Sequence, residues 1–390
     1  IAVIGSNMVD LISYINKMPV AGETVEAPNF SIGCGGKGAN QAVAAAKYGA
    51  DVLMMTKVGD DIFADNTIKN FDKLGIDTKY VEKVKGLSSG VAPIFVDESG
   101  QNRIIIVKGA NKYLLPSDID RASEELKKCS LIILQLEINL ETVYYAINFG
   151  KKYNIPVLLN PAPATKDLDI EEACKCEFFV PNETELAILT DMPVNTDDEI
   201  KNAAEYLVNK GLKNVIVTMG SRGAMWVTKE NCQYLKSFKV NAVDTSGAGD
   251  AFIGCFASCY VKNNDVMLSM KEASAFAALS VTKKGTQISY PTKEQVKEFL
   301  LYHIVQGKYT FTNLPAEPTW FETIAPADTA KVNMYLLKDR NPNIVFNNFD
   351  GHYKSSIKPR TSNLYNSDGS YMHVLDSWLD RPTKEQLNMK

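Results

Sequence analysis

Histidine is scarce in this chain and is confined to its last part. The 390 residues contain three histidines, His303, His352 and His373. A Ser-His-Asp triad, a Cys-His pair and a His-ligated zinc site are therefore excluded from the first three hundred residues. Proton transfer in that part of the chain has to rely on carboxylate, Lys, Tyr or Cys side chains.

Paired cysteines, long apolar runs and an excess of positive charge are also missing. The seven cysteines form no C-x-x-C pair, which is typical of buried thiols in a reducing compartment. Cys174 and Cys176 form a lone C-x-C, a weak signal for a metal. No segment is long and apolar enough to cross a bilayer, no signal-peptide pattern opens the chain, and the net charge is −4. We expect a cytoplasmic protein without a membrane or nucleic-acid partner.

Strand and helix patterns alternate from residue 49 onward. Strands are predicted at 52–58, 131–136, 156–160, 178–181 and 214–218, and helices at 62–74, 142–153 and 197–210. Further along, an apolar helix is predicted at 273–281 and a final amphipathic helix at 294–302. This alternation predicts an α/β fold with a doubly wound, mostly parallel sheet flanked by helices. Small or polar residues follow successive strands, where such sheets bind ligands: Asp10, Glu137, Asn160, Asn182, Glu185, Thr218 and Gly220.

Shorter strand patterns lie outside this alternation. Residues 12–32 are β-branched and interrupted by Pro19 and Gly22, and a hairpin is predicted from 92–96 and 103–107 around residues 97–100. We expect strands within about 11–32 and 90–108 to form a small β lid over the site.

The most informative stretch is residues 243–252, with the sequence VDTSGAGDAF. It separates a predicted β-rich run at 234–243 from an apolar helix at 251–260. A glycine-rich turn before a helix directs backbone N–H groups toward one point and stabilises negative charge there. The carboxylate of Asp250 beside such a turn suits deprotonation of an alcohol during phosphoryl transfer. The alternative interpretation is an ordinary turn in which Asp250 caps the helix.

A second glycine-rich stretch, GCGGKGANQ at residues 33–41, opens a predicted Ala-rich helix at 39–48. Its glycines, Lys37 and Asn40 suit a polar ligand with several hydroxyl groups. The pattern is neither a Walker A loop nor a dinucleotide fingerprint. The alternative is a flexible turn before a core helix.

Four stretches in order resemble the ribokinase (phosphofructokinase-B-type) sugar kinase family: GGKGANQ at 35–41, NPAPA at 160–164, PNETE at 181–185 and DTSGAGD at 244–250. The likeness extends from residue 1 to about residue 302. It implies a ribokinase-like fold and transfer of the γ-phosphate of ATP to the 5-hydroxyl of D-ribose.

The resemblance also implies roles for individual residues. Asp250 is then the catalytic base, with an anion hole of Gly247, Ala248 and Gly249. The sugar is held by Asp10, Gly36, Lys37, Gly38, Ala39, Asn40 and Glu137. ATP is bound by Asn182, Thr218, Gly220, Ser221, Gly223, Gly249 and Ser274.

The resemblance further implies cations and a partner. Asn182 and Glu185 belong to the motif associated with Mg²⁺ and phosphate. A monovalent cation, usually K⁺, is bound by Asp244, Ser246, Ser280, Lys283, Gly285 and Ser289, mostly through backbone carbonyls. The lid strands resemble those through which family members form homodimers.

Two positions depart from the family pattern. Met8 stands where many members have an Asn that touches the sugar, and Ser274 stands where Asn or His is common near the adenine. Loss of the Asn would favour 2-deoxyribose, because no buried amide then has to be matched by a hydroxyl. Other sugar or nucleoside kinases and a non-catalytic sugar-binding protein stay open as alternatives.

Residues 303–390 lie beyond the resemblance and belong to no family that we recognise. Strands are predicted at 332–337 and 344–346, and a short helix at 372–379. This extension is interpreted as an accessory module, a partner-binding piece or a fusion artefact.

Overall fold

The computed structural model describes residues 1–97 and 102–301, and beyond them the backbone of short strands between residues 319 and 372. The chain divides into two compact units, one of residues 1–237 and 242–291 and one of residues 238–241 and 292–390. The domain boundary near residue 302 stays a prediction.

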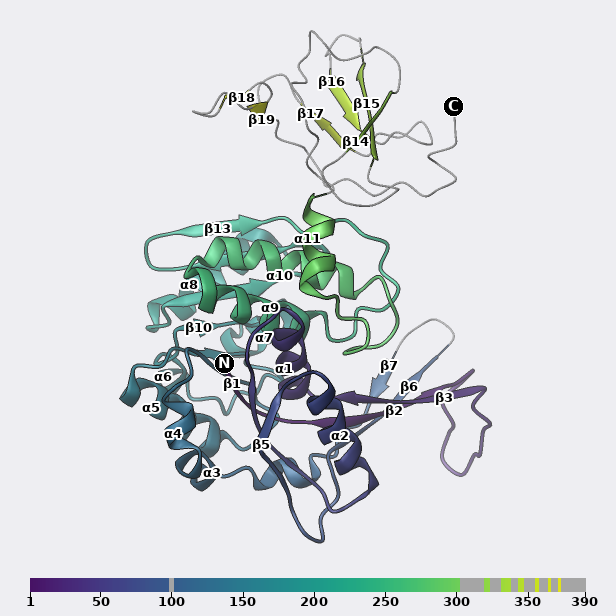
Figure 1. The fold of residues 1–390 in the computed structure, drawn as a ribbon, viewed down its shortest axis with the longest axis vertical. Helices are drawn as coiled ribbons and strands as arrows, with labels where there is room; N and C mark the ends of the chain where they lie inside the picture. Colours follow the sequence, from purple (N-terminus) through teal and green to yellow (C-terminus); the bar gives the residue numbers. More distant parts are fainter. Residues whose placement is uncertain are drawn as a thin grey trace. The chain divides into compact units, whose positions relative to one another are not determined.

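The first unit is built on a nine-stranded sheet with the order β13-β12-β11-β10-β9-β8-β1-β4-β5 (Figure 1). The strands are β1 (Ala2–Ile4), β4 (Leu53–Val58), β5 (Asp77–Lys83), β8 (Ile132–Leu134), β9 (Val157–Leu159), β10 (Phe178–Phe179), β11 (Asn214–Thr218), β12 (Ala224–Val227) and β13 (Cys232–Leu235). Neighbouring strands from β11 to β5 are parallel, and β12 and β13 add an antiparallel edge. The predicted doubly wound, mostly parallel sheet is confirmed.

The chain adds strands on both sides of β1. It first adds β4 and β5 on one side and then β8 to β11 on the other. A ligand cleft in such a sheet lies at the carboxyl ends of the strands near this reversal. The residues that follow β1 and β8 are therefore well placed for a site.

Helices connect these strands. In the first unit they are α1 (Lys37–Lys47), α2 (Ile62–Lys73), α3 (Pro116–Arg121), α4 (Ser123–Leu126), α5 (Leu140–Tyr153), α6 (Ile170–Ala173), α7 (Glu183–Thr190), α8 (Asp197–Asn209), α9 (Ala248–Asn263) and α10 (Val266–Ser280), with 3-10 turns η1 (Gly109–Tyr113) and η2 (Gly220–Arg222). Among the described helices, none combines the length and the apolar character that a membrane span requires.

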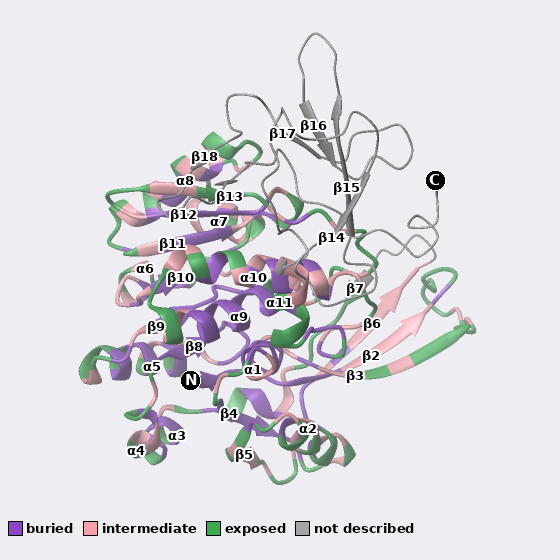
Figure 2. Ribbon diagram, turned by 45° about the horizontal axis from the view of Figure 1, so that its top comes forward, coloured by how far each residue is buried: buried purple, intermediate pink, exposed green. Residues whose placement is uncertain are grey.

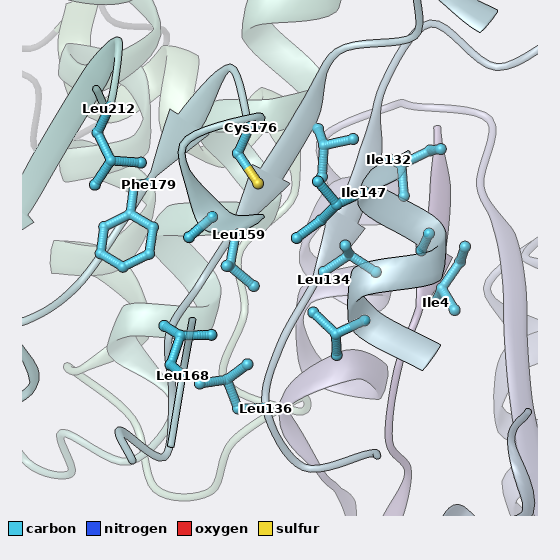
Figure 3. Close-up of a cluster of buried hydrophobic side chains, with 14 of the residues drawn as sticks. Ile4, Ile132, Leu134, Leu136, Ile147, Leu159, Leu168, Cys176, Phe179 and Leu212 are labelled. Atoms are coloured by element: carbon cyan, nitrogen blue, oxygen red, sulfur yellow. The ribbon is translucent and has the colours of Figure 1, made fainter. Parts of the chain in front are cut away.

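One face of the sheet packs against α3, α5 and α8. Its apolar cluster contains Ile4, Leu134 and Leu159 from three strands together with Ile147 of α5 (Figure 3). Full burial of a side chain of this size stabilises the fold by about 1.5–3 kcal/mol. The alternation of side chains along each strand places the intervening residues on the opposite face.

The opposite face carries α1, α9 and α10, whose inward surfaces are buried (Figure 2). The ring of Phe178 meets that of Phe256 of α9 edge-on, with 5.2 Å between their centroids. At the crossing of α9 with α1, a Cβ on Gly254 would lie 2.4 Å from the carbonyl oxygen of Gln41. The absence of a side chain at Gly254 therefore allows the two helices to approach closely.

A separate four-stranded sheet has the order β3-β2-β6-β7 (Figure 1). It is formed by β2 (Met8–Tyr14), β3 (Asn29–Gly35), β6 (Val91–Val96) and β7 (Asn102–Ile104). These strands occur where the sequence predicts the lid strands, and β6 and β7 form the predicted hairpin. Phe30 and Ile32 on β3 expose more than half of their surface, as does Ile104 on β7.

Two predictions for the second half of the first unit need correction. The β-rich run expected at 234–243 is wrong beyond Leu235, because β13 is the edge strand and the chain then leaves the sheet. The helix expected at 273–281 starts earlier, since the Asp265 side chain caps α10 by accepting a hydrogen bond from the Leu268 N–H at 2.9 Å.

The second unit contains α11 (Lys293–Leu301), close to the predicted final helix, and two small antiparallel sheets. These are formed by β14 (Thr319–Glu322), β15 (Lys331–Leu337), β16 (Asn343–Phe346) and β17 (Ser355–Ile357), and by β18 (Leu364–Tyr365) and β19 (Tyr371–Met372). The strands predicted at 332–337 and 344–346 are confirmed. The helix predicted at 372–379 starts in β19, which corrects its first residue, and the rest lies outside the described residues.

Candidate active site

The glycine-rich turn at 244–249 leads directly into α9. Gly247 caps the helix with φ 71°, and a Cβ at this position would lie 2.2 Å from Cγ2 of Thr286. The Tyr290 hydroxyl donates to the Gly247 carbonyl oxygen at 3.0 Å. The first N–H groups of a helix lack intrahelical acceptors, and α9 starts at Ala248. The turn therefore has the geometry of an anion site at a helix N-terminus.

Asp250 lies in the first turn of α9 and is not its cap residue. Its side chain is buried, and both carboxylate oxygens accept hydrogen bonds from consecutive residues of α1. Asn40 Nδ2 lies 3.0 Å from Oδ2, and Gln41 Nε2 lies 2.8 Å from Oδ1. The two glycine-rich stretches thus meet at the carboxylate that the sequence predicts to be the base.

Asp10 lies on β2 with its carboxylate over the backbone of β3. A Cβ on Gly35 would lie 2.3 Å from Oδ2 of Asp10. Burial first, and then the nearby carboxylates of Glu137 and Asp250, together raise the pKa of Asp10 to about 7. The three predicted acidic residues therefore share one electrostatic environment.

Glu137 follows β8 and holds the start of α1. Its Oε2 accepts hydrogen bonds from the Lys37 backbone N–H at 2.9 Å and from the Ser6 hydroxyl at 2.5 Å. Gly38 packs closely against the residues that follow β1, and a Cβ on Gly38 would lie 2.6 Å from the Ser6 carbonyl oxygen. Gly38 and Ala39, predicted to hold the sugar, are thus buried parts of the helix start.

Lys37 supplies positive charge among these carboxylates. Its burial alone would lower the pKa, but Asp250, Glu137 and Glu185 outweigh that effect and raise the pKa of Lys37. Burial also raises the pKa of Glu185, while the Asn182 N–H and Lys37 act against this. Lys37 therefore stays charged at neutral pH between the groups predicted to hold the sugar and those predicted to hold phosphate.

Five of the seven residues predicted to bind the nucleotide lie at or just after the ends of β10 and β11, whereas Gly249 lies on α9 and Ser274 on α10. Asn182 caps α7 in a capping box, in which its Oδ1 accepts from the Glu185 N–H and Glu185 Oε2 accepts from the Asn182 N–H, both at 2.8 Å. Thr218 forms a parallel β-bridge to Asn182.

Gly220, Ser221 and Gly223 form the turn after Thr218. Gly223 has φ 115°, and a Cβ there would lie 2.0 Å from the carbonyl oxygen of Leu235, so only glycine fits. Ser274 is half-buried on α10, and no described contact joins it to this turn.

The segment from Ser280 to Ser289 is tied to the glycine-rich turn by Asp244. Asp244 Oδ1 accepts from the Ser246 N–H and Oδ2 from the Gly285 N–H, both at 2.9 Å. Burial opposes ionisation, but these two N–H groups outweigh it and lower the pKa of Asp244. Ser280 and Ser289 are buried, and Lys283 is exposed. Carboxylate, hydroxyl and backbone carbonyl oxygens, which these residues supply, are the ligands that hard cations prefer.

The structure adds buried polar residues to this site, and two of them, Gln135 and Gln287, were not singled out from the sequence. Gln135, Asn160 and Gln287 are buried polar side chains connected to Asn40 and Gln41. Gln41 belongs to the quoted motif and Asn160 follows a strand, so both had a signal. Gln135 and Gln287 had none, because an isolated Gln in a strand or loop is ordinary. Among the described residues, no group of three His, Cys, Asp or Glu side chains is arranged to hold a metal ion.

Comparison with protein families now decides the class of protein. Residues 1–293 match the pfkB family of carbohydrate kinases. The chain belongs to this family. The kinase is 68% identical over 300 residues to a deoxyribokinase of Salmonella typhi, which covers 77% of this chain and 98% of that protein. It is 37% identical over 313 residues to a ribokinase of Dictyostelium discoideum, and the match covers 76% of this chain and 98% of that protein.

Solved structures agree with the family assignment. A ribokinase of Thermotoga maritima superposes with a TM-score of 0.70 at 37% identity, over 77% of this chain and 98% of that one. An Arabidopsis thaliana ribokinase complexed with ribose and ATP gives a TM-score of 0.72 at 31% identity, over 76% and 97%. The kinase therefore has the ribokinase-like α/β fold that the sequence predicts.

Replacement of Asp10 tests the electrostatics of the site. The carboxyl ionises near pH 4 in the unfolded chain, so between pH 4 and about 7 the folded protein binds the extra proton and loses stability as the pH rises. We expect Asp10→Asn to raise the free energy of unfolding at pH 8 by roughly 1–4 kcal/mol and to have least effect near pH 4.

Denaturant titrations at pH 4, 6 and 8 measure this difference, with the exposed Asp198→Asn as the matched control. A stability difference between wild type and Asp10→Asn that does not change with pH would contradict the assignment.

Proposed function

We propose that this protein transfers the γ-phosphate of ATP to the 5-hydroxyl of 2-deoxy-D-ribose, with D-ribose as a poorer substrate. The sequence analysis favours D-ribose and keeps 2-deoxyribose as its alternative. The alternative now has the stronger support, because the relative with 68% identity is a deoxyribokinase and the ribokinase relative has 37%.

Met8 is the observation that carries this choice of sugar. It lies two residues before Asp10 on β2, so the two side chains point to the same side of the strand. Its backbone abuts the start of α1, since a Cβ on Gly36 would lie 2.6 Å from the Met8 nitrogen. Met8 is 2% exposed. An amide at this position would be left without a hydrogen-bond partner by a sugar that lacks the 2-hydroxyl. The apolar Met8 side chain needs no such partner, so 2-deoxyribose is accepted without this cost.

Asp250 acts as the general base in this proposal. Each carboxylate oxygen has two lone pairs, and the amides of Asn40 and Gln41 use one on each. A lone pair is left to accept the proton of the sugar hydroxyl. The negative charge that develops during transfer lies against the N-terminus of α9 at Gly247, Ala248 and Gly249.

Cations complete the phosphate side. Mg²⁺ bound with the nucleotide would neutralise phosphate charge, and Glu185, beside Lys37 and the Asn182 cap, is the carboxylate we assign to it. We assign a monovalent cation, K⁺, to the segments around Asp244 and Gly285, whose carbonyl and carboxylate oxygens suit it. The cations are bound from solution, whereas the base and the anion hole are formed by residues of the protein.

The lid sheet supports a homodimer. Phe30, Ile32 and Ile104 are large apolar residues, each more than half exposed, and a second copy of the sheet would cover them. All seven cysteines are free thiols, which favours the reducing environment of the cytoplasm.

The isosteric change Asp250→Asn tests the base. Because the amide cannot accept the proton, we expect kcat to fall by roughly 10²–10⁴-fold while sugar affinity, measured by calorimetry, changes little. Asp198→Asn on the exposed start of α8 is the control. If ATP consumption with 2-deoxyribose survives in Asp250→Asn, another group is the base.

The change Met8→Asn tests the choice of sugar. An amide at this position would gain a hydrogen bond from the 2-hydroxyl of ribose and lack one with 2-deoxyribose, so the ratio of kcat/KM for 2-deoxyribose over ribose should fall about tenfold. Met18→Asn, outside β2, should leave the ratio unchanged. An unchanged ratio in Met8→Asn would remove Met8 from the account.

A further inference from the structure

A chain of buried carboxamides surrounds the carboxylate of Asp250. Asn40, Gln41, Gln135, Asn160 and Gln287 are each at most 6% exposed. They come from α1, the residue after β8, the residue after β9 and the segment after α10. A buried polar group is costly unless it is paired, so their convergence on one carboxylate needs an explanation.

The ionised carboxylate sets the direction of every amide. It can only accept hydrogen bonds, so Asn40 and Gln41 must both turn their NH₂ groups toward Asp250. Their carbonyl oxygens then point away and need donors. Gln287 Nε2 lies 2.9 Å from Asn40 Oδ1, and Gln135 Nε2 lies 2.7 Å from Gln41 Oε1.

The Gln287 branch extends further from the site. Its Oε1 accepts from Asn70 Nδ2 of α2 at 2.8 Å, and its backbone carbonyl accepts from Lys47 Nζ at 2.8 Å. Gln287 is therefore fixed at both its side chain and its backbone. Because it is fixed, its amide can hold Asn40 in one orientation.

The Gln41 branch is short and more deeply buried. Gln41 is fully buried and its Nε2 also lies 3.1 Å from Asn160 Oδ1, while Asn160 Nδ2 donates to the Val180 carbonyl oxygen at 2.8 Å. Both hydrogens of the Gln41 amide are thus committed. Rotation of this amide would place its oxygen against the carboxylate, which is repulsive.

We propose that Gln41 and Gln287 are positioning residues that hold the carboxylate of Asp250 in one orientation toward the sugar. Gln41 acts on Asp250 directly, and Gln287 acts through Asn40. The inference rests on the proposed function, because it takes Asp250 as the base. The groups that Gln41 and Gln287 hold are the ones that would touch the substrate.

The test compares Gln41→Leu and Gln287→Leu with Gln233→Leu, a control on the edge strand β13. With saturating ATP and 2-deoxyribose, we expect kcat of Gln41→Leu at pH 7 to fall roughly ten- to hundredfold. Loss of a donor favours the protonated carboxyl, so the acid limb of its kcat–pH profile should move up by about one pH unit. Gln287→Leu should lower kcat less and raise KM for the sugar, because Asn40 loses its orientation.

The experiment also separates the titration of other ionisable groups near Asp250 from the effect on kcat. They are Asp10 on β2, Lys37 on α1, Glu137 after β8, Glu185 on α7 and Tyr290 after α10. Groups that act on sugar affinity affect KM and are removed from kcat by saturation. A merely structural role would lower the melting temperature without moving the acid limb.

Each outcome decides. A lower kcat with a shifted acid limb in Gln41→Leu, and an unaltered Gln233→Leu, supports the inference. An acid limb that stays at the wild-type pH overturns it, even if stability falls. If Gln41→Leu does not fold, Gln287→Leu decides the question through the acid limb of its kcat–pH profile and through its KM for the sugar. Survival of turnover in Asp250→Asn would overturn the proposed base, whereas its loss together with wild-type behaviour of both Gln variants would overturn the positioning role alone.

Discussion

The site depends on the hydrogen bonds between α1 and the carboxylate at the start of α9. Asn40 and Gln41 reach Asp250 because the two helices approach closely at Gly254, where no side chain separates them. Most of α9 is buried, so it cannot shift alone. The fold thus fixes the predicted base by packing, and the amides fix its orientation.

Charge is distributed around this contact so that one cation balances several anions. Lys37 lies among Asp250, Glu137 and Glu185, and its pKa rises in spite of burial. Glu137 in turn holds the backbone of Lys37. The same motif residues therefore build the start of α1 and set its electrostatics. A phosphate group brought to the N-terminus of α9 would meet both the helix end and this ammonium group.

Much of the fold and part of the site could be predicted from the sequence. The βα alternation predicts the parallel sheet. Each glycine-rich stretch could be identified from its own sequence, but their meeting at Asp250 is seen only in the fold. The β-rich run predicted at 234–243 is wrong beyond Leu235, because the chain leaves the sheet there although Phe238, Val240 and Val243 are residue types that favour strands. Gln135 and Gln287 could not be found, because their importance comes from long-range pairing that no local pattern carries. For the sugar, Met8 was the one departure in the sequence that pointed to 2-deoxyribose, and the sequence analysis kept D-ribose as its first interpretation.

The most direct measurement is the steady-state kcat/KM of the wild-type chain for 2-deoxy-D-ribose and for D-ribose, with ATP and Mg²⁺ and with the position of the phosphate identified. The account predicts that both sugars are phosphorylated on the 5-hydroxyl and that 2-deoxyribose has the higher kcat/KM. A higher value for ribose, or no transfer to either sugar, would contradict it.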